Sequence, residues 1–596
     1  MRTFRFGGHQ YLPKLSEMSS SAPRNLDVLW LRIFPFLRWW PLVNQHTLKV
    51  DLIAGLTVAL VAIPQSLAYA QLSGVPAYYG LYAALIPVII GALFGSSLIL
   101  STGPVAMTSL LTAASIMPLA TYGTEQFYAY VILMALLSGL LQIGLGLARM
   151  GVLLNFLSYP VLRGFINAAA IIIGLSQLPA MVGLSLKNSQ HFLTDILHVI
   201  ENINTMHLES VIFGLGSLAL MALLKKFAPR LPGVLIVVAL TTFISYIIGF
   251  EALGGRVVGA IPQGLPSISL PPVDWKASIH MLPTAFVIAL ISFMEAMSSA
   301  KIIAIKTRTQ WDENQELIGQ GLAKVAAAFS HAMPVSGSFS RSALNLAAGA
   351  RTGMSSVFSA LTVLLTLLFF TPLLYHLPKP VLAAIIMMAV VSLINVKTIK
   401  DAWVANKQDG AAAVITFIAT LIFAPNIQNG ILIGIILSLT LFLFRTMKPH
   451  IVLLGLDKDG ALRGAERFNL PKLHPQVTAI RFDGQLYFAN VSYFEESVLY
   501  LVSQDSSLKF ILVVANGING LDASGVEMLR NLIDRLNQNK ITLVFCSLKG
   551  VVTDVMERTG LVNEIGPENI FHSEKMALDA ISMRLDRERA NQNMAP

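Results

Sequence analysis

Two stretches rich in Gly, Pro and hydroxyl residues interrupt the apolar sequence of this chain, and they constrain its fold more than any other feature. They are Ser101-Thr-Gly-Pro-Val-Ala-Met-Thr-Ser109 and Pro334-Val-Ser-Gly-Ser-Phe-Ser-Arg-Ser342, and a short apolar run follows each. Irregular backbone at membrane depth is tolerated only where it is buried in protein or lines a cavity. The first turn of each short helix has unpaired N–H groups with partial positive charge. Two such ends that face each other would attract an anion near the bilayer midplane, as in secondary transporters.

The composition is typical of an integral membrane protein. Of the 596 residues, 55% are hydrophobic and 13% are charged, whereas a soluble protein has roughly 25% charged residues. The single cysteine, Cys546, excludes an internal disulfide and a multi-thiolate metal site. Residues 1–45 contain no secretory signal pattern, and we expect a cytosolic segment with an amphipathic surface helix around Trp30 to Trp40 that places Trp39 and Trp40 at the interface.

Breaks in hydropathy predict about fourteen membrane segments, two of them short, within a transmembrane region of residues 46–448. The segments lie approximately at residues 51–71, 78–95, 104–118, 126–148, 155–180, 208–225, 233–250, 281–300, 315–333, 339–350, 354–375, 379–395, 410–424 and 428–446. Seven segments followed by seven segments give two halves of opposite topology, in which the third and tenth segments are equivalent. These are the two interrupted segments, so the symmetry and the motifs agree.

The distribution of Lys and Arg predicts the orientation. If the amino terminus is cytosolic, the loops after even-numbered segments are cytosolic too, and they contain Arg149, Lys225, Lys226, Lys301, Lys306, Arg351, Lys397, Lys400 and Lys448. The opposite loops carry far fewer basic residues, namely Lys187, Arg256, Lys276 and Lys379. By the positive-inside rule, both termini are expected in the cytosol. The net charge of +9 therefore indicates membrane topology, and no nucleic acid is expected as a partner.

From residue 449 the composition changes to that of a soluble domain. Strand patterns alternate with helix patterns, in chain order at 477–482, 491–502, 510–514, 524–537, 541–545 and 549–559. This alternation predicts a small α/β domain of about 110–130 residues within residues 449–596.

Several motifs together resemble the SulP (sulfate permease) family of anion transporters. The matching stretches are Asp51-Leu-Ile-Ala-Gly-Leu-Thr, Ile63-Pro-Gln-Ser-Leu-Ala-Tyr-Ala, Gly80-Leu-Tyr-Ala and the two interrupting motifs. They occur in the family's order, and the resemblance covers nearly everything after about residue 40. The C-terminal region resembles the family's cytosolic STAS domain, including Asp522-Ala-Ser-Gly525.

The resemblance implies an α-helical polytopic membrane protein built from two inverted seven-helix repeats, followed by a cytosolic α/β STAS domain. A core of helices 1–4 and 8–11 would move like an elevator relative to a gate of helices 5–7 and 12–14. We expect a secondary active transporter of sulfate, bicarbonate or a dicarboxylate that is proton-coupled, homodimeric and embedded in the lipid of a bacterial inner membrane. The alternatives are an uncoupled exchanger or channel on the same fold and a membrane-tethered signalling protein.

The anion is expected between the amino ends of the two short helices, where the resemblance places the family's substrate. The expected substrate-binding residues are Gln65, Tyr69, Val105, Ala106, Phe339, Ser340 and Arg341. Backbone N–H groups and the partial helix charges would attract the anion, and the guanidinium group adds a full charge. Gln65 and Tyr69 are four residues apart and share one helix face. Alternatively, these small and polar residues only permit or strengthen helix packing.

Glu295 is a carboxylate within an apolar helix, where a charge costs on the order of 2.5–3.5 kcal/mol on insertion scales. By resemblance, an acidic residue here binds the coupling cation, H⁺ or Na⁺, and Ser299 would be a second ligand. Lys324 lies in the middle of the ninth segment, where many relatives have Asn. A Glu295–Lys324 pair would let the ammonium group replace the cation and leave proton coupling or uncoupled exchange. The alternative is that Glu295 is a structural carboxyl group bonded to backbone.

The loop before residue 525 joins a strand to a helix in the C-terminal domain, with Asp522 as the expected helix cap. Ser524 matches the serine that is phosphorylated in anti-sigma factor antagonists of this fold, which makes it a candidate regulatory residue. A plain helix-start residue is the simpler interpretation. We find no spacing typical of a metal centre and no nucleophile elbow, so the sequence predicts neither an enzyme nor a bound cofactor.

Overall fold

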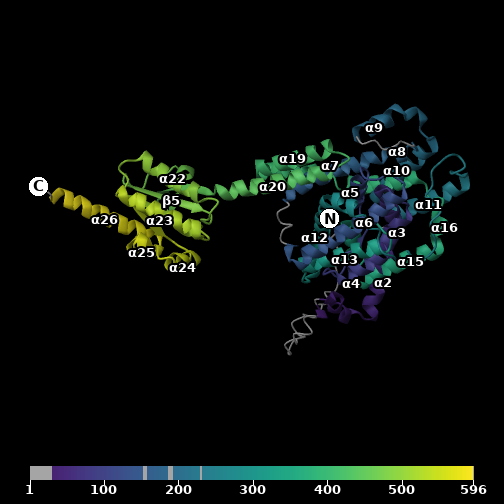
Figure 1. Cartoon of the computed structure of the whole chain (residues 1–596), viewed down its shortest axis with the longest axis horizontal. Helices are drawn as coiled ribbons and strands as arrows, with labels where there is room; N and C mark the ends of the chain where they lie inside the picture. Colours follow the sequence, from purple (N-terminus) through teal and green to yellow (C-terminus); the bar gives the residue numbers. More distant parts are fainter. Residues whose placement is uncertain (1–29, 32, 152–157, 185–191, 229–230, 595–596) are drawn as a thin grey trace. The chain divides into compact units, whose positions relative to one another are not determined.

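A computed structural model describes residues 30–31, 33–151, 158–184, 192–228 and 231–594 (Figure 1). The chain divides into two compact units, Met1–Ser438 and Leu439–Pro596, and each is described by itself. The division falls within helix α20 (Gln428–Met447), before the boundary at residue 448 that composition predicts. The expected tail before residue 30 and the start of the expected segment 155–180 lie outside the described residues.

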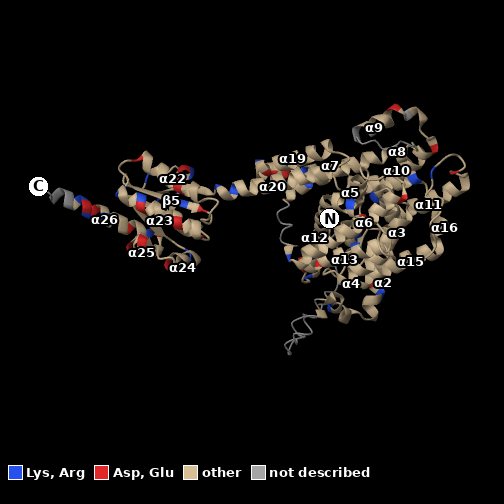
Figure 2. Ribbon diagram, in the orientation of Figure 1, with Lys and Arg blue, Asp and Glu red and all other residues tan. Residues whose placement is uncertain are grey.

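The first unit is a bundle of apolar helices with few charged residues along their lengths (Figure 2). Its helices up to α20 are α2 (Gln45–Ser73), α3 (Tyr78–Ala83), α4 (Ile86–Phe94), α5 (Ala106–Ile116), α6 (Glu125–Leu147), α7 (Tyr159–Ser176), α8 (Leu178–Met181), α9 (Phe192–Glu201), α10 (Leu208–Phe227), α11 (Gly233–Ile248), α12 (Trp275–Thr307), α13 (Glu313–Phe329), α14 (Phe339–Ala347), α15 (Met354–Leu365), α16 (Thr371–Leu374), α17 (Lys379–Val391), α18 (Val396–Ala405) and α19 (Lys407–Ile422). Shorter turns are η2 (Pro35–Arg38), η3 (Trp40–Leu42), η5 (Ile203–Thr205) and the π-helical η6 (Thr366–Phe370). Within the described ranges, 8 helices are long and apolar enough to cross a membrane.

Packing partners repeat in inverted order between the two halves of this unit. Helix α6 packs against α13, and its counterpart α15 packs against α4. Likewise, α2 packs against α15 as α12 packs against α6, and α7 packs against α19 as α17 packs against α10. In each of these three comparisons, exchanging every segment with its counterpart in the other half converts the first contact into the second. The predicted membrane fold of two inverted repeats is therefore confirmed.

Two glycines allow helices α4 and α13 to approach closely. A Cβ atom on Gly319 of α13 would lie 2.5 Å from Cα of Gly95, which follows α4. Nonbonded carbon atoms do not come this close, so only hydrogen fits at this position. The close approach brings α13 beside the loop that leads into β1 (Thr102–Gly103), the first interrupted segment.

A buried carboxylate holds that loop. Glu316 is 1% exposed, and its Oε2 accepts hydrogen bonds of 2.9 Å from the backbone N–H groups of both Ser96 and Ser97. Its Oε1 accepts a 3.0 Å bond from Gln320 Nε2, which also donates to Thr102 Oγ1 at 2.9 Å. The carboxylate therefore connects α13, the loop and β1, and burial makes each lost bond costly.

The second interrupted segment has a similar anchor. Asp51 of α2 is fully buried, and its Oδ1 accepts from the N–H groups of Arg351 at 2.7 Å and Thr352 at 3.2 Å. Its Oδ2 accepts from the Thr352 hydroxyl. The carboxylate thus fixes the connection between α14 and α15.

The expected amphipathic helix around Trp30 to Trp40 is present only in part: residues 30, 31 and 33 are helical, but the α-helix does not continue to Trp40. Two short turns, η2 and η3, follow these residues, with Pro35 first in η2 and Pro41 second in η3. Proline lacks the N–H group that a continuing helix needs. Trp40 is 55% exposed, but Trp39 is 3% exposed and its ring lies against Gly353, so it belongs to the core and not to the interface.

The second unit is an α/β domain around a 6-stranded sheet with strand order β4-β3-β5-β6-β7-β8. The strands are β3 (His450–Leu456), β4 (Leu462–Gly464), β5 (Val477–Asp483), β6 (Phe510–Val514), β7 (Thr542–Cys546) and β8 (Ile570–Phe571). From β5 to β8 the strands are parallel, whereas β3 pairs antiparallel with both neighbours. The remaining elements are α21 (Ala465–Phe468), α22 (Val491–Gln504), η7 (Ala515–Gly517), α23 (Ala523–Gln538), α24 (Gly550–Arg558), α25 (Leu561–Ile565), η8 (Pro567–Asn569) and α26 (Glu574–Met594).

Helices cover both faces of this sheet. Residues of α22, α23, α24 and α25 form one buried apolar cluster with the sheet, and residues of α26 form a second cluster on the other face. The three predicted strands and three predicted helices are present as β5, β6, β7, α22, α23 and α24. Strands β3, β4 and β8 and helix α26 were not predicted.

Replacing Gly319 by alanine tests the close approach of α4 and α13. Because the new Cβ would overlap backbone of residue 95, we expect a loss of about 1–3 kcal/mol in stability, typical of overpacking. The matched control is Gly216→Ala in α10, where nothing lies within 4 Å of the added Cβ. Thermal unfolding in detergent should show a lower midpoint for the first variant only; equal midpoints would contradict the close approach.

Replacing Glu316 by glutamine tests the loop anchor. Donors face both carboxylate oxygens, so either orientation of the amide brings its NH₂ group against another N–H group. We expect a loss of about 1–3 kcal/mol, measured by thermal unfolding. Glu125→Gln at the exposed start of α6 is the control and should change stability by less than about 0.5 kcal/mol. A Glu316→Gln variant as stable as the control would show that the anchor contributes nothing.

Candidate anion site

The two interrupted segments meet at a short antiparallel ladder. Strand β1 pairs with β2 (Ser336–Gly337), with Thr102 opposite Gly337 and Gly103 opposite Ser336. Two hydrogen bonds extend the pairing: Ser338 N–H donates to Ser101 O at 2.8 Å, and Ser101 N–H donates to Ser342 Oγ at 2.9 Å. The amino ends of α5 and α14, which follow the two strands directly, are thereby brought together.

The two helix starts differ in how they are capped. Val105 is the N-cap of α5 and provides no side-chain cap, so the first N–H groups of α5 have no side-chain acceptor there. Ser338 caps α14 by accepting from Arg341 N–H at 3.4 Å. Val105 and Ala106 are buried at 7% exposure each, whereas Phe339 is 57% exposed and Ser340 is also exposed.

Arg341 is the largest fully buried side chain of the described residues, at 1% exposure. Its Nη1 donates to Pro104 O at 2.9 Å and to Gln65 Oε1 at 3.5 Å. Its Nη2 is buried with no hydrogen-bond partner. That nitrogen lies beside Gly103, since a Cβ added there would be 2.9 Å from Nη2. A fully charged group therefore sits at the ladder with one donor nitrogen unsatisfied.

Gln65 and Tyr69 bring α2 to the same place. Both are buried, at 8% and 6% exposure, and they lie one turn apart after Pro64, which is inside the helix. Gln65 contacts Arg341 through its Oε1, and Tyr69 lies one turn further along the same helix. The structure thus brings Gln65, Tyr69 and Arg341 together beside the start of α5, as the sequence predicts. Their role in anion binding stays a prediction.

Glu295 of α12 contacts β2. Its Oε2 accepts from the Ser336 hydroxyl at 3.4 Å, and the same hydroxyl donates to Ser292 O at 2.7 Å. Ser299, the expected second cation ligand, is 2% exposed and donates its hydroxyl to the backbone carbonyl of residue 295 at 3.2 Å. Its hydroxyl is therefore engaged with the helix and not with the Glu295 carboxylate.

Lys324 is completely buried but forms no direct ion pair with Glu295 among the described residues. Its Nζ donates to Gln142 Oε1 at 2.8 Å and to Ser292 Oγ. Gln142 is itself held by the carbonyl of Ala289 at 3.0 Å. In place of the expected pair, Lys324 bonds the hydroxyl of Ser292, and Ser336 bonds both the backbone carbonyl of Ser292 and the Glu295 carboxylate.

Several residues of this core were not singled out from the sequence. Gln142 and Ser292 are uncharged and lie in apolar helices, so nothing nearby in the sequence marks them as partners of Lys324. Glu316 lies near the start of α13, where a carboxylate resembles an ordinary first-turn residue. The sequence offered one signal for this anchor: Gln315, Glu316 and Gln320 are polar residues close together on one helix.

In the second unit, Asp522 caps α23 as predicted. Its Oδ1 accepts from Gly525 N–H at 2.8 Å, and its Oδ2 accepts from Phe488 N–H at 3.0 Å. Ser524 is exposed in the first turn of α23. It borders a shallow hollow lined by Val491, Glu495, Ala523, Glu527, Met528, Asn531 and Arg535. A kinase could reach this hydroxyl, but its regulatory role remains a prediction.

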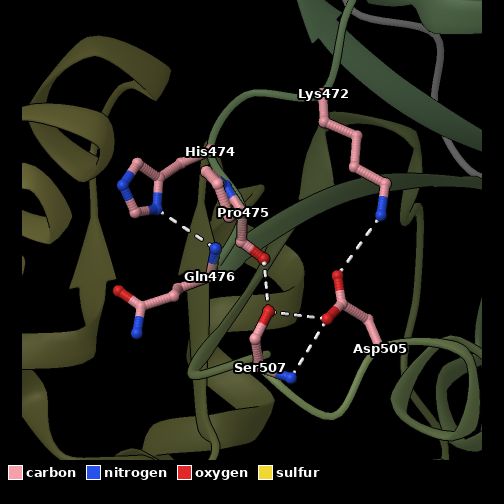
Figure 3. Close-up of polar contacts among 6 residues, drawn as sticks. All are labelled: Lys472, His474, Pro475, Gln476, Asp505 and Ser507. Carbon is pink, nitrogen blue, oxygen red and sulfur yellow. Dashed lines mark hydrogen bonds and ion pairs between the residues drawn. The ribbon is translucent and has the colours of Figure 1, made fainter.

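A second hollow of this unit is polar and lies at the starts of β5 and β6 (Figure 3). Near it, Asp505 accepts from the hydroxyl of Ser507 at 2.6 Å and from the Lys472 ammonium group at 3.2 Å. The hydroxyl and backbone N–H of Ser507, followed by the lysine, lower the pKa of Asp505 below its ordinary value. These groups satisfy one another. Within the described ranges, no group of three or more His, Cys, Asp or Glu residues could hold a metal ion.

Comparison with known proteins agrees with this geometry. Residues 48–418 match the family described as Sulfate permease family, and residues 471–577 match the STAS domain. The chain is 32% identical over 557 residues to Sulfate transporter 4.1, chloroplastic, of Arabidopsis thaliana, covering 90% of this chain and 81% of that protein. It is 30% identical over 543 residues to a probable sulfate transporter of Mycobacterium tuberculosis, covering 91% of this chain and 96% of that protein.

Solved structures show the same fold. The murine Solute Carrier 26 family member A9 anion transporter in the inward-facing state has a TM-score of 0.84 at 23% identity, covering 97% of this chain and 100% of that chain. The transmembrane domain of a cyanobacterium bicarbonate transporter, BicA, has a TM-score of 0.55 at 26% identity, covering 66% of this chain and 98% of that chain. The chain belongs to the sulfate permease family, and it is a multi-pass membrane anion transporter, not an enzyme, with a C-terminal STAS domain.

Proposed function

We propose that the chain is a proton-coupled sulfate transporter whose anion binds between the amino ends of α5 and α14. The observation that carries the proposal is the buried Nη2 of Arg341, a charged donor with no partner beside the β1–β2 ladder. A buried charge without a partner is strongly unfavourable. A bound anion would supply the missing acceptor.

Sulfate fits this donor arrangement. An oxyanion with several equivalent oxygens can accept from a planar guanidinium group and from backbone N–H groups at a helix start. The uncapped first turn of α5 offers such N–H groups beside the arginine. Sulfate is also the substrate given in the names of the Arabidopsis and Mycobacterium relatives. Bicarbonate and dicarboxylates present the same oxygen acceptors and are the competing substrates in the test below.

The charges of the core favour a proton as the coupling ion. Arg341 and Lys324 carry positive charges, Glu295 carries a negative one, and sulfate brings two negative charges. When sulfate is bound and Glu295 is protonated, the charges of these four groups sum to zero. A net charge of zero lowers the electrostatic free energy of burying the groups in a low-dielectric core. The Ser336 hydroxyl links this carboxyl group to strand β2 of the anion site. Lys324, held by Gln142 and Ser292, supplies the internal cation that would otherwise be Na⁺.

Uncoupled exchange is the second candidate, and Lys324 is the observation in its favour. A permanent ammonium group could balance Glu295 throughout the cycle, so that no proton would need to move with the anion. The two candidates make opposite predictions for accumulation against a gradient.

The resemblance to the sulfate permease family supports an elevator-like movement as part of the same proposal. Helices α2–α6 and α12–α15 would form the moving core, and α7, α10, α11, α17, α19 and α20 would form the gate. The elevator motion, the homodimer and the location of both termini in the cytosol of a bacterial inner membrane belong to the same proposal. The Lys and Arg distribution supports this orientation.

Replacing Arg341 by glutamine tests the anion site. Charged hydrogen bonds contribute about 1.5–3 kcal/mol, so uptake of radiolabelled sulfate into proteoliposomes should fall at least about tenfold. Arg341→Lys keeps the charge but loses the planar fork, and we expect an intermediate rate. Arg351→Gln, an exposed arginine, is the control. Uptake of labelled bicarbonate and of labelled succinate, measured in parallel, identifies the substrate. Wild-type sulfate uptake by a correctly folded Arg341→Gln variant would exclude this site.

Replacing Glu295 by glutamine tests the coupling. The amide imitates the protonated carboxyl group, so sulfate counterflow should persist, whereas accumulation driven by an inward proton gradient should be lost. Glu125→Gln is the matched control and should accumulate sulfate normally. Lys324→Asn removes the internal cation, and its uptake should become Na⁺-dependent. If the wild-type protein never exceeds the equilibrium level under a proton gradient, the uncoupled exchanger is correct.

A further inference from the structure

We propose that α18 and the first turns of α7 form a binding site for anionic lipid headgroups at the membrane surface. Helix α18 has no buried residues, although it follows the apolar helix α17 and precedes the apolar helix α19. Because both neighbours run through the bundle, the exposed helix between them lies where the bundle meets the membrane surface.

One face of α18 is both apolar and basic. Exposed apolar side chains are Val396 at 69%, Trp403 at 47% and Val404 at 79%. At positions i, i+4, i+7 and i+8, which share a helix face, the sequence places Val396, Lys400, Trp403 and Val404. Lys397 lies at the edge of the same face, and its side chain is exposed. Apolar side chains with Trp and Lys are typical of a helix that lies in the headgroup region.

Hydrogen bonds fix the start of α18 against α7. Asn395, the residue that caps α18, donates its N–H to Asn167 Oδ1 at 2.6 Å and accepts from Asn167 Nδ2 at 3.3 Å. Its own Oδ1 accepts from Thr398 N–H at 3.2 Å. The amino end of α18, with its partial positive charge, therefore has a defined position beside α7.

Arg163 supplies a further charge at this junction. It lies one turn before Asn167 on α7, and its backbone carbonyl accepts from Asn167 Nδ2 at 2.8 Å. Its guanidinium group lies over the Tyr159 ring, 4.9 Å from the centroid, and its Nε is buried with no hydrogen-bond partner. Across the described residues, neither this arginine nor Lys397 nor Lys400 forms an ion pair.

An anionic phospholipid is the occupant that matches both halves of the surface. The lysines and the arginine favour a phosphate group, and the exposed valines and tryptophan favour acyl chains. Soluble phosphate would satisfy only the charges. Asp401 and Asp409 offset two positive charges. Four basic residues still leave a basic excess around the helix, namely Lys397, Lys400, Arg163 and Lys407. Basic sites between helices at a membrane face bind acidic headgroups in this way.

The test is native mass spectrometry of the full-length protein in detergent, titrated with dioleoyl-phosphatidylglycerol. Each basic residue near the surface contributes about 1 kcal/mol to such binding. The Lys397→Gln/Lys400→Gln variant should therefore bind the tightest phosphatidylglycerol about 30-fold more weakly. Lys225→Gln/Lys226→Gln at the end of α10 is the matched control and should bind as the wild type does. Arg163→Gln provides an independent variant on α7 and should also weaken binding.

Three outcomes would overturn the proposal. The first is equal phosphatidylglycerol binding by the wild type and the α18 variant, which would assign the face to another occupant such as a second copy of the chain. The second is an equal loss in the α10 control, which would show only general charge attraction. The third is displacement by inorganic phosphate at the lipid's own concentration, which would identify a soluble anion site. Phosphatidylcholine should not compete.

Discussion

Backbone at membrane depth must find hydrogen-bond partners within the protein, and this requirement organises the transport unit. The chain interrupts two helices inside the bundle, and each interruption supplies the partner of the other through the β1–β2 ladder. With one interruption alone, a row of buried N–H and C=O groups would remain unpaired, at a cost of several kcal/mol for each group. The two halves of the chain are therefore bound together at the point where the short helices begin.

The ladder also depends on buried carboxylates far from it in the sequence. Glu316 on α13 holds the loop before β1, and Asp51 on α2 holds the connection that follows α14. Both carboxylates are buried, and each of their oxygens accepts at least one hydrogen bond from the protein. Arg341 differs from them, because its Nη2 is buried and donates no hydrogen bond to the described part of the protein. The contrast distinguishes the carboxylates that hold the scaffold from the arginine that the proposed function assigns to the anion.

Local patterns in the sequence predicted most of the elements, but not strands β3, β4 and β8 or helix α26. The helices were predicted from apolar runs, and the meeting of α5 with α14 was predicted from the two interrupting motifs and the resemblance. The Asp522 cap was predicted from its residue type. Contacts between distant segments could not be read in this way. Lys324 was expected to contact Glu295, but Gln142 and Ser292 hold it instead. Trp39 was expected at the interface, but Gly353 leaves room for its ring in the core. Both outcomes depend on which side chains meet after folding.

The separation of Lys324 from Glu295 has a consequence for coupling. A direct ion pair would keep the carboxylate charged through the whole cycle, because the ammonium group would oppose its protonation. Here Ser292 and Gln142 take the hydrogen bonds of the ammonium group, and the carboxylate receives only a 3.4 Å bond from Ser336. Lys324 therefore adds a positive charge to the core without a hydrogen bond to the Glu295 carboxylate. On the proposed mechanism, this arrangement leaves Glu295 free to take a proton when a divalent anion enters, and to release it when the anion leaves.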